Sequence, residues 1–567
     1  MTPQGYGRDP FAALTPQVAA GIAACATLVL LVRLWGLNWD AGSALHPDAR
    51  HMFNMISQIL PRLAEAREAG MGWVEILFST ETSPLNVRAH EAFYVYGDLP
   101  LNAQSVVAYA LGLTGYTEII GLVRTVSALV FASSVIAVCL TALILSARTD
   151  ATLLAGVLFA LAPSAFQNAG FGTVDVWLMA TWAWATLGMV LLIFGGGGRV
   201  AIWTGLCMAA AVSTKVTGAF LGIGALTVLF GLAVRSPLQA IRIGILGALA
   251  FGIGVHLFSS ISVIGLFRPD PAMLADLQEL RVVGQSPNFP PNWQWQINET
   301  WTERIGDIAL FGIGPVILVG CVTGFFLRPA ILSLVAAVVL PLLATTVFPD
   351  TAALRYAAPA LAPLAVVAAL GFARVGTIGV VIGAVAAIVW GSGIVRLHLA
   401  EHSRIAASLW LMEQPVGTVI AVESPWDDGL PLAIPDNPLR RDHLTMRTLG
   451  LEAGTDADKV DRLVTIAAEA DLIVVSSGRF AEVQPHMADR FPVSVAWYAG
   501  LTDGSFCLNP VWQNIPGYPI LHWRIDDTAI QEPWTVYDHP PVTIYAPTDC
   551  FDPATIRAAL TAALPRR

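Results

Sequence analysis

Residues 17–37 of the chain read QVAAGIAACATLVLLVRLWGL, and residues 45–51, which follow shortly afterwards, read LHPDARH. An apolar helix needs about 20 residues to cross the hydrocarbon core of a bilayer, so the first stretch predicts a membrane span. The second stretch then lies at the mouth of that span, where ionisable side chains are costly unless they are used. Asp48 lies between His46 and His51, and its carboxylate could act as a general base. The alternative is an ordinary helix start, with Asp48 in the first turn after a proline.

The composition is that of a polytopic membrane protein. The 567 residues are 55% hydrophobic and 13% charged, with a mean hydropathy of +0.64, whereas soluble domains average about 25% charged residues. The formal net charge of −10 argues against nucleic acid as a partner, because such proteins need clustered lysine and arginine. Four of the six cysteines lie in apolar segments. Cys507 and Cys550 lie in the polar C-terminal part, where they could pair if that part is outside the cytoplasm.

Hydropathy predicts eleven membrane spans. They are residues 17–37, 119–146, 151–169, 174–194, 200–213, 217–234, 240–265, 305–327, 329–348, 356–373 and 375–396. The apolar run 99–113 is short for a crossing, and we interpret it as interfacial or re-entrant. Residues 51–66 carry apolar side chains on one helical face, which indicates a helix lying on the membrane surface.

Arginines in the short connections orient the spans, because lysine and arginine favour the cytoplasmic side. Arg148, Arg199, Arg235 with Arg242, Arg328 and Arg374 fall at alternate turns. A single topology with the N-terminus inside satisfies all of them. The sequence therefore predicts a multi-pass protein of the inner (plasma) membrane. Its membrane domain, residues 1–398, carries outer loops at 38–118 and 266–304, and residues 399–567 form an extracytoplasmic domain.

The composition from Ala400 onward is that of a soluble α/β domain. Helices are expected near 403–413 and at 456–470, and strands at 417–423, 472–476 and 542–545. Apolar β-branched runs that alternate with helices are typical of such a domain. Its sequence shows no glycine-rich phosphate loop, metal-ligand spacing or nucleophile elbow. We expect it to support the membrane domain or to recognise an acceptor.

Three further ionisable residues open predicted spans from the outer side. Asp175 begins one span, Lys215 lies at an outer junction among hydroxyls, and Arg355 with Tyr356 begins another. A lysine among hydroxyls and backbone amides suits a phosphate, as does the rigid fork of an arginine. Two alternatives stay open, namely that Asp175 only complements a helix dipole, or that it forms with Lys215 an ion pair that merely joins two helices.

The outer loop 266–304 is too long and too polar for a simple turn. Loops longer than about 15 residues are usually functional or disordered. The loop contains Trp293 and Trp295 within an aromatic and proline-rich stretch. We interpret Trp293 as a candidate substrate-binding residue, with an interfacial aromatic belt as the alternative.

These motifs follow one another in a distinctive order. An outward His-Pro-Asp loop, a second aspartate opening a later span, a Ser-Thr-Lys segment, an Arg-Tyr-x-x-Pro-x-x-x-Pro span start and a soluble tail occur in sequence. This order resembles the GT-C membrane glycosyltransferases. Within them it is most similar to the phospholipid carrier-dependent enzymes, which include protein O-mannosyltransferase-like and lipid A aminoarabinose transferase-like proteins. Residues 426–431 (WDDGLP) and 535–540 (TVYDHP) also look like recurring phrases of this group.

The resemblance implies an inverting enzyme that moves a sugar from a polyprenyl-phosphate donor to a hydroxyl acceptor. Undecaprenyl phosphate-linked mannose or another hexose is the implied donor, and a glycan, a lipid or a protein is the acceptor. By the same resemblance Asp48 is the base, Asp175 is a second acidic site residue, and Lys215 and Arg355 contact the lipid phosphate. His46, His51 and Tyr356 join Trp293 as candidate substrate-binding residues.

The chain departs from this pattern at one position. Many relatives have Asp-Glu in the first loop, whereas here Ala49 follows Asp48, so a paired acid is absent or is supplied by another residue such as Glu91. Without a carboxylate pair no cofactor or divalent metal is predicted, although Asp48, His51 and Asp175 could supply ligands. Two other classes of function are a multi-pass transporter, against which the lack of an internal repeat counts, and a non-catalytic factor of envelope glycan assembly.

Overall fold

The computed structural model describes residues 11–90, 92–264, 268–296, 300–347, 353–423, 426–432, 439, 442, 444–452 and 457–565. The chain forms two compact units. The first unit is Met1–Leu37, Asp48–Val282 and Ile305–Val395, and the second is Asn38–Pro47, Val283–Arg304 and Arg396–Arg567. The second unit therefore includes two segments, Asn38–Pro47 and Val283–Arg304, from the loops that the sequence division assigns to the membrane domain.

The first unit is helical. Its α-helices are α1 (Pro16–Trp35), α2 (Pro47–Glu68), α3 (Trp73–Phe78), α4 (Asp98–Ala110), α5 (Tyr116–Ser146), α6 (Thr149–Ala160), α7 (Pro163–Phe171), α8 (Val174–Ile193), α9 (Gly198–Val212), α10 (Leu221–Ala233), α11 (Pro237–Phe258), α12 (Pro271–Gln285), α13 (Trp301–Asp307), α14 (Pro315–Gly324), α15 (Pro329–Val347), α16 (Leu361–Arg374) and α17 (Thr377–Leu399). Short helical turns are η1 (Val87–His90), η2 (Val216–Phe220), η4 (Ile308–Ile313) and η5 (Leu354–Ala360), and a two-stranded hairpin pairs β1 (Val263–Ile264) with β2 (Arg268–Pro269).

The helices confirm a polytopic membrane fold. Within the described part of the chain, eight helices are long and apolar enough to cross a membrane. Two further pairs, α6 with α7 and α13–η4 with α14, are bent by 58° and 94° and raise the number to ten if each pair is one span. The short apolar helix α9 coincides with the remaining expected segment. All eleven expected segments are therefore helical, but eight to ten of them qualify as spans.

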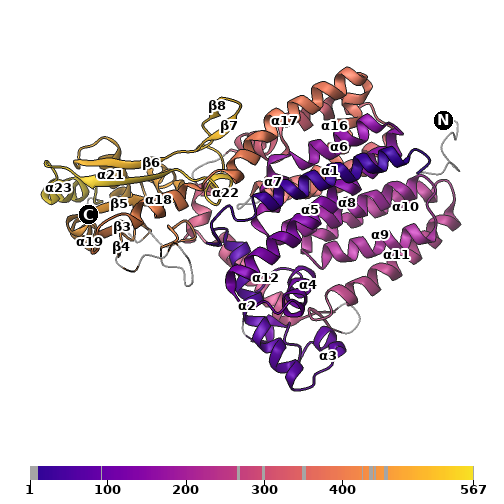
Figure 1. The fold of residues 1–567 in the computed structure, drawn as a ribbon, viewed down its shortest axis with the longest axis horizontal. Helices are drawn as coiled ribbons and strands as arrows, with labels where there is room; N and C mark the ends of the chain where they lie inside the picture. Colours follow the sequence, from indigo (N-terminus) through magenta and orange to yellow (C-terminus); the bar gives the residue numbers. More distant parts are fainter. Residues whose placement is uncertain are drawn as a thin grey trace. The chain divides into compact units, whose positions relative to one another are not determined.

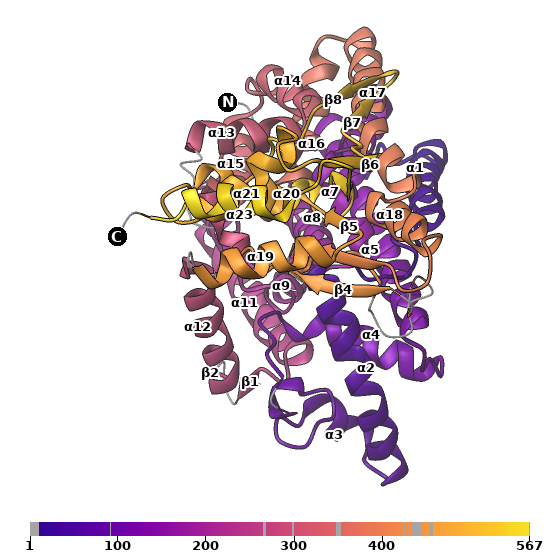
Figure 2. The ribbon, with the colours of Figure 1, turned by 90° about the vertical axis from the view of Figure 1, so that its left-hand side faces the viewer.

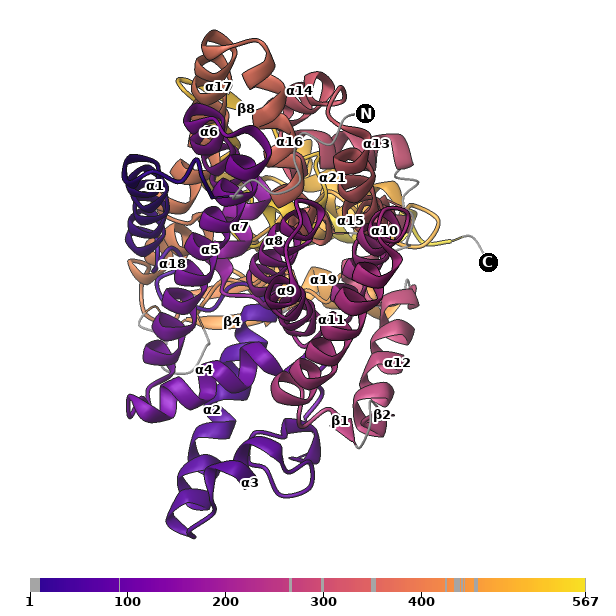
Figure 3. The same cartoon turned by 90° about the vertical axis from the view of Figure 1, so that its right-hand side faces the viewer.

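Burial differs sharply among these helices. Helices α8 and α16 are mostly enclosed by protein, whereas α1, α10 and α11 direct apolar side chains outward. Leu226 and Phe230 on α10 are 68% and 73% exposed, which in this fold is a surface for lipid. Helices α5, α8, α9 and α11 run side by side (Figure 1), and Figure 3 shows α8, α9, α10 and α11 next to one another from another side.

The amphipathic segment near residue 50 is a helix, but its apolar face is covered by the protein. Met52, Met55, Ile56, Ile59 and Leu63 on α2 are all buried within the chain. The hydrophobic periodicity alone indicated a helix lying on the membrane surface, but this face is not available for that role. Helix α4 has 13 residues and is not among the spans.

The second unit is an α/β domain around a five-stranded sheet. Its elements are η3 (Pro290–Gln296), α18 (Ser403–Met412), β3 (Val419–Val422), β4 (Thr445–Thr448), α19 (Ala457–Glu469), β5 (Leu472–Val475), α20 (Gly478–Ala481), η6 (Gln484–His486), α21 (Pro492–Thr502), β6 (Leu508–Asn514), β7 (Tyr518–Ile520), β8 (Trp523–Ile525), α22 (Glu532–Thr535), β9 (Val542–Pro547) and α23 (Pro553–Ala562). The strand order is β4-β3-β5-β9-β6. Strands β4, β3 and β5 are parallel to one another, and β9 is antiparallel to both of its neighbours, β5 and β6. Helices α19, α21 and α23 pack together in this unit (Figure 2).

The second unit contains a disulfide and a buried glutamate. Cys507 and Cys550 are bonded, which resolves the pairing that the sequence left open. Glu423 follows β3 and accepts hydrogen bonds from the Tyr498 hydroxyl and from the Ser476 amide, the latter at 3.2 Å. Burial, opposed by the Tyr498 hydrogen bond, raises the pKa of Glu423 to about 8.

This raised pKa predicts a loss of stability in alkaline solution. The folded domain holds the Glu423 proton up to about pH 8, whereas the unfolded chain releases it near the ordinary value of 4.5. The free energy of unfolding therefore falls as the pH rises between these values. We expect Glu423→Gln, which cannot ionise, to reduce the fall in Tm between pH 5 and pH 9 by roughly 5 °C. Thermal unfolding of the full chain in detergent measures this fall in Tm. Equal falls in Tm for the wild type and for Glu423→Gln would contradict the raised pKa of Glu423.

Candidate active site

Asp48 forms an ion pair with Arg355. Asp48 lies in the first turn of α2, directly after Pro47, and Arg355 lies in η5, more than 300 positions further along the chain. The Arg355 Nη1 atom is 2.7 Å from the Asp48 Oδ2 atom. Both side chains are about one fifth exposed, 21% for Arg355 and 23% for Asp48, so a ligand can still reach them.

Asp175 forms a second ion pair, with Lys215. Asp175 is in the first turn of α8, and Lys215 precedes η2 in the connection from α9. The Lys215 ammonium donates to the Asp175 Oδ1 atom at 2.7 Å. The Asp175 side chain is only 3% exposed, whereas that of Lys215 is 16% exposed. The ion pair that the sequence offered as an alternative is thus present, and an ammonium has two donors left for another acceptor.

Two tyrosines connect these ion pairs into one cluster. The Lys215 ammonium lies 4.8 Å from the ring centre of Tyr356 and 5.9 Å from that of Tyr96. The Arg355 guanidinium is 5.7 Å from the Tyr356 ring. Burial, reinforced by the charge of Asp48, raises the pKa of Tyr96 well above its ordinary value. Tyr96 therefore remains a neutral phenol that can donate a hydrogen bond beside both carboxylates.

Tyr96 was not singled out in the sequence. The stretch 93–100 is aromatic and rich in turn residues, but nothing in it shows which ring faces the charged residues. The signal that could have found it is the pair of tyrosines two positions apart in the loop between α3 and α4. The close approach of this loop to residue 215 is a property of the tertiary structure.

A buried network holds the loop that carries Tyr96. The Arg88 guanidinium donates to the carbonyl oxygens of Tyr94 and Tyr96 at 2.6 and 2.9 Å. It also contacts Asp98 at 3.3 Å, and Asp98 in turn accepts hydrogen bonds from the Ser262 hydroxyl and amide at 2.6 and 2.9 Å. Because each charge is paired inside the protein, the network fixes the backbone around Tyr96.

The same loop is bonded directly to the Lys215 segment. The Gly97 amide donates to the Thr214 carbonyl at 3.0 Å, and the Leu99 amide donates to the Ser213 carbonyl at 3.0 Å. A Cβ atom at Gly97 would lie 2.1 Å from the Ser213 carbonyl oxygen. Only glycine allows this approach, which brings Tyr96 to the Lys215 ammonium.

His51 lies one turn along α2 from Asp48 and stacks on Tyr94. The two ring centres are 5.9 Å apart at an interplanar angle of 22°. Burial lowers the pKa of His51 and outweighs the opposing charge of Asp48. His51 is therefore a neutral imidazole at neutral pH, suited to accept or donate one hydrogen bond near Asp48.

The remaining two sequence candidates belong to the second unit. The His46 ring packs on Tyr537, with ring centres 4.6 Å apart. Trp293 is 1% exposed and packs on Phe480 and Phe491 in the core of the α/β domain. Its indole nitrogen donates to the Pro287 carbonyl at 2.9 Å. The position of Trp293 is therefore that of a core side chain.

The metal-ligand set considered from the sequence is not assembled. Among the residues that the structure describes, no group of three or more histidines, cysteines, aspartates or glutamates could hold a metal ion. Asp48 and Asp175 instead each face a cation. Glu91, the possible second acid, lies outside the described residues.

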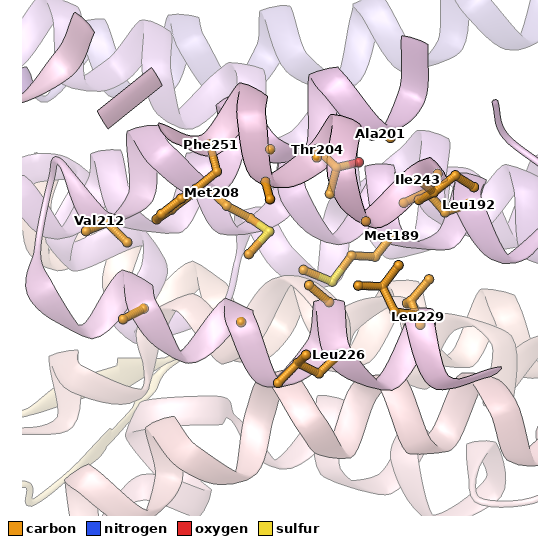
Figure 4. Close-up of a pocket in the computed structure, with 18 of the residues that line it drawn as sticks. Met189, Leu192, Ala201, Thr204, Met208, Val212, Leu226, Leu229, Ile243 and Phe251 are labelled. Atoms are coloured by element: carbon orange, nitrogen blue, oxygen red, sulfur yellow. The ribbon is translucent and has the colours of Figure 1, made fainter. Parts of the chain in front are cut away.

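An apolar cavity begins beside the Lys215 segment. Its volume is about 350 Å³, within the range of small-molecule sites. Helices α8, α9, α10 and α11 enclose it (Figure 4), with Met189, Thr204, Met208, Leu229 and Phe251 among the lining residues. Val212, Gly218 and Ala219 also line it, and these residues flank Lys215 in the chain. The cavity thus extends from residues on either side of Lys215 into the apolar region of the bundle.

No family model matches the chain, and no curated protein matches it. Solved structures do. The archaeal oligosaccharyltransferase AglB from Archaeoglobus fulgidus, in complex with an inhibitory peptide and a dolichol-phosphate, has a TM-score of 0.45 and 13% identity over 89% of this chain and 74% of that chain. ArnT from Cupriavidus metallidurans, bound to undecaprenyl phosphate, has a TM-score of 0.41 and 13% identity over 93% of this chain and 98% of that chain. The arabinofuranosyltransferase AftD from Mycobacteria has a TM-score of 0.35 and 16% identity over 94% of this chain and 40% of that chain.

The chain resembles GT-C glycosyltransferases in structure as well as in its motifs. The likeness is distant, with TM-scores below 0.5 and identities of 13–16%. It therefore carries no argument about the substrate, the mechanism or the site residues of this protein.

Proposed function

We propose that the protein is an inverting glycosyltransferase that moves a sugar from a polyprenyl-phosphate donor to a hydroxyl acceptor at the membrane surface. The observation that carries the proposal is the assembly of Asp48, Arg355, Asp175 and Lys215 in the membrane unit, together with an apolar cavity lined by residues that flank Lys215 in the chain. A cation beside a cavity for hydrocarbon suits a ligand that has a phosphate attached to an apolar chain.

The reaction uses these residues in distinct roles. Asp48 accepts the proton of the acceptor hydroxyl while that oxygen forms a bond to the anomeric carbon. The bond between the anomeric carbon and the phosphate oxygen breaks on the opposite face, and the electron pair leaves with the phosphate. Lys215 and Arg355 stabilise this negative charge, because both are cations of the same cluster. The rings of Tyr96 and Tyr356 shield Lys215 and Arg355 from water.

The site is proposed to face an extracytoplasmic compartment. Arginines at alternate connections of the expected spans give this orientation. The bond between Cys507 and Cys550 supports it, since disulfides persist in oxidising compartments. A hexose such as mannose is the donor sugar that the motif resemblance suggests.

The test is transfer of a radiolabelled sugar from synthetic polyprenyl-phosphate donors to a membrane and envelope extract. Labelled product that depends on the protein and on a polyprenyl phosphate is the expected result, and isolation of the product identifies the acceptor. No transfer from any of several donor sugars, by protein that binds the lipid, would overturn the proposal.

The cavity gives a separate prediction about the donor chain. A Cβ atom at Gly222, which lines the cavity from α10, would meet nothing within 4 Å. Gly222→Leu should therefore fold and fill space that a prenyl chain needs. Excluding about two methylene groups costs about 1.6 kcal/mol, so we expect KM for a long-chain donor to rise about tenfold. A donor with a chain of one or two isoprene units should be used as by the wild type.

The matched control lies on the same helix. Gly231 is also open to an added Cβ atom but does not line the cavity. Gly231→Leu should leave KM unchanged for both donors. An equal rise in KM for short and long donors in Gly222→Leu would show that the cavity does not hold the chain.

A further inference from the structure

The segment Asn38–Pro47 joins α1 to α2 and belongs to the second unit, although it lies between helices of the first. It is tightly folded. The Asp40 carboxylate accepts hydrogen bonds from the Gly42 and Leu45 amides at 3.2 and 3.0 Å. Ala41 and Ala44 have φ values of 50° and 52°, a left-handed conformation that alanine adopts only when its surroundings impose it.

Aromatic contacts fasten both ends of this segment within the second unit. The Trp39 ring centre lies 5.7 Å from that of His398 and 5.5 Å from that of His402. At the other end, His46 packs on Tyr537 at 4.6 Å between ring centres. His46 is 1% exposed, so this contact rather than solvent determines the position of its ring.

Tyr537 is itself rigidly supported. Its hydroxyl is 3.2 Å from the Arg479 Nη2 atom. Arg479 is 1% exposed and paired with Glu532 at 2.5 Å. The preceding carbonyl, of Val536, accepts a hydrogen bond from Arg404 at 2.8 Å. The Tyr537 side chain is thus held at its hydroxyl and the preceding backbone at its carbonyl, which fixes the ring that contacts His46.

The residues after Tyr537 extend this support. His539 lies 2.5 Å from Asp538 and 2.9 Å from Asp527, and Asp538 is 3.4 Å from His398. The two carboxylates raise the pKa of His539 to about 10 against the effect of burial. The imidazolium therefore stays charged at neutral pH and holds Asp538, which is the residue that contacts His398 at the end of α17.

We infer that Tyr537 is a positioning residue for the transfer reaction. This inference rests on the proposed function. Its ring holds His46, and the next two residues are Pro47 and the base Asp48. The peptide bond from Pro47 to Asp48 passes from the second unit to the first, and proline fixes the backbone angle at this point. Displacement of a catalytic group by about 1 Å can cost about a hundredfold in rate. Residues 535–540 (TVYDHP) thereby hold the segment that precedes Asp48, a role different from acceptor recognition.

The test compares Tyr537→Leu with Tyr537→Phe in the full-length protein. We expect Tyr537→Leu to lower kcat at least tenfold with KM for the polyprenyl donor unchanged. Tyr537→Phe keeps the ring and should retain most of the activity. Tyr545→Leu is the matched control, because Tyr545 lies on β9 of the same unit and packs at its hydrophobic core. It should lower stability without changing kcat.

Hydrogen exchange of residues 38–47 separates this inference from the proposed function. Exchange should accelerate in Tyr537→Leu and stay slow in Tyr537→Phe and Tyr545→Leu, whether or not a donor has been found. Unchanged exchange, or a kcat equal to that of the wild type, would overturn the positioning role. If Tyr537→Leu does not fold, His46→Leu breaks the same contact without touching Arg479 and should accelerate exchange in the same way.

Discussion

Asp48→Asn is expected to lower the rate of sugar transfer by about 10²–10⁴-fold, the usual contribution of a general base. The amide has nearly the same shape as the carboxylate and can still accept a hydrogen bond from Arg355, which lies 2.7 Å away. It cannot take up the proton of the acceptor hydroxyl. Donor binding should change little, because the phosphate contacts are assigned to Lys215 and Arg355. Single-turnover transfer with saturating donor measures the chemical step directly.

Two further variants make this result specific. Asp489→Asn removes an exposed carboxylate from the second unit and should leave the rate unchanged. Asp48→Glu keeps the ionisable group but moves it by about one bond length, so it should retain part of the activity. Full activity of Asp48→Asn, with normal expression, would exclude Asp48 as the base.

Lys215→Met is expected to lower kcat by about 10²–10³-fold, as does the loss of one charge-stabilising donor in other enzymes. It has a second consequence, because Asp175 is 3% exposed and would lose its cation. Breaking a buried ion pair in this way costs about 3–5 kcal/mol. A single substitution therefore cannot tell a phosphate contact from a pair that only joins two helices.

The double variant Asp175→Asn with Lys215→Met separates these two roles. It removes both charges, so most of the lost stability should return, as measured by thermal unfolding in detergent. Transfer should stay low, because no cation faces the leaving phosphate. Recovery of transfer together with stability would mean that the pair is purely structural.

Much of the fold follows from local sequence. The expected spans all coincide with helices, and the strand at residues 472–476 is β5 (Leu472–Val475). Apolar runs and periodicities are properties of adjacent residues, so they survive in the tertiary structure. Predictions about what a side chain contacts were less accurate than predictions of helices and strands. The apolar face of α2 is covered by protein rather than by lipid, since periodicity shows a buried face but not what buries it.

The candidate site shows the same division. Residue type, position near the ends of the predicted spans and the motif resemblance selected Asp48, Asp175, Lys215, Arg355 and Tyr356, which the structure brings into one cluster. They were not enough to find Tyr96, or to tell that Trp293 is a core residue. Whether an aromatic side chain lines a site or fills a core depends on neighbours that are distant in the chain.

The sequence by itself determined that this is a membrane protein of many helices with a C-terminal α/β domain, because hydropathy and strand patterns act over short stretches. It also determined the chemical types of the ionisable residues at the ends of the spans. Only the tertiary structure decided which carboxylate faces which cation. Asp48 and Arg355 pair across more than 300 residues, and Gly97 packs on Ser213 so that Tyr96 reaches Lys215. Ion pairs and ring contacts act over a few ångströms in space, and no local pattern in the chain records them.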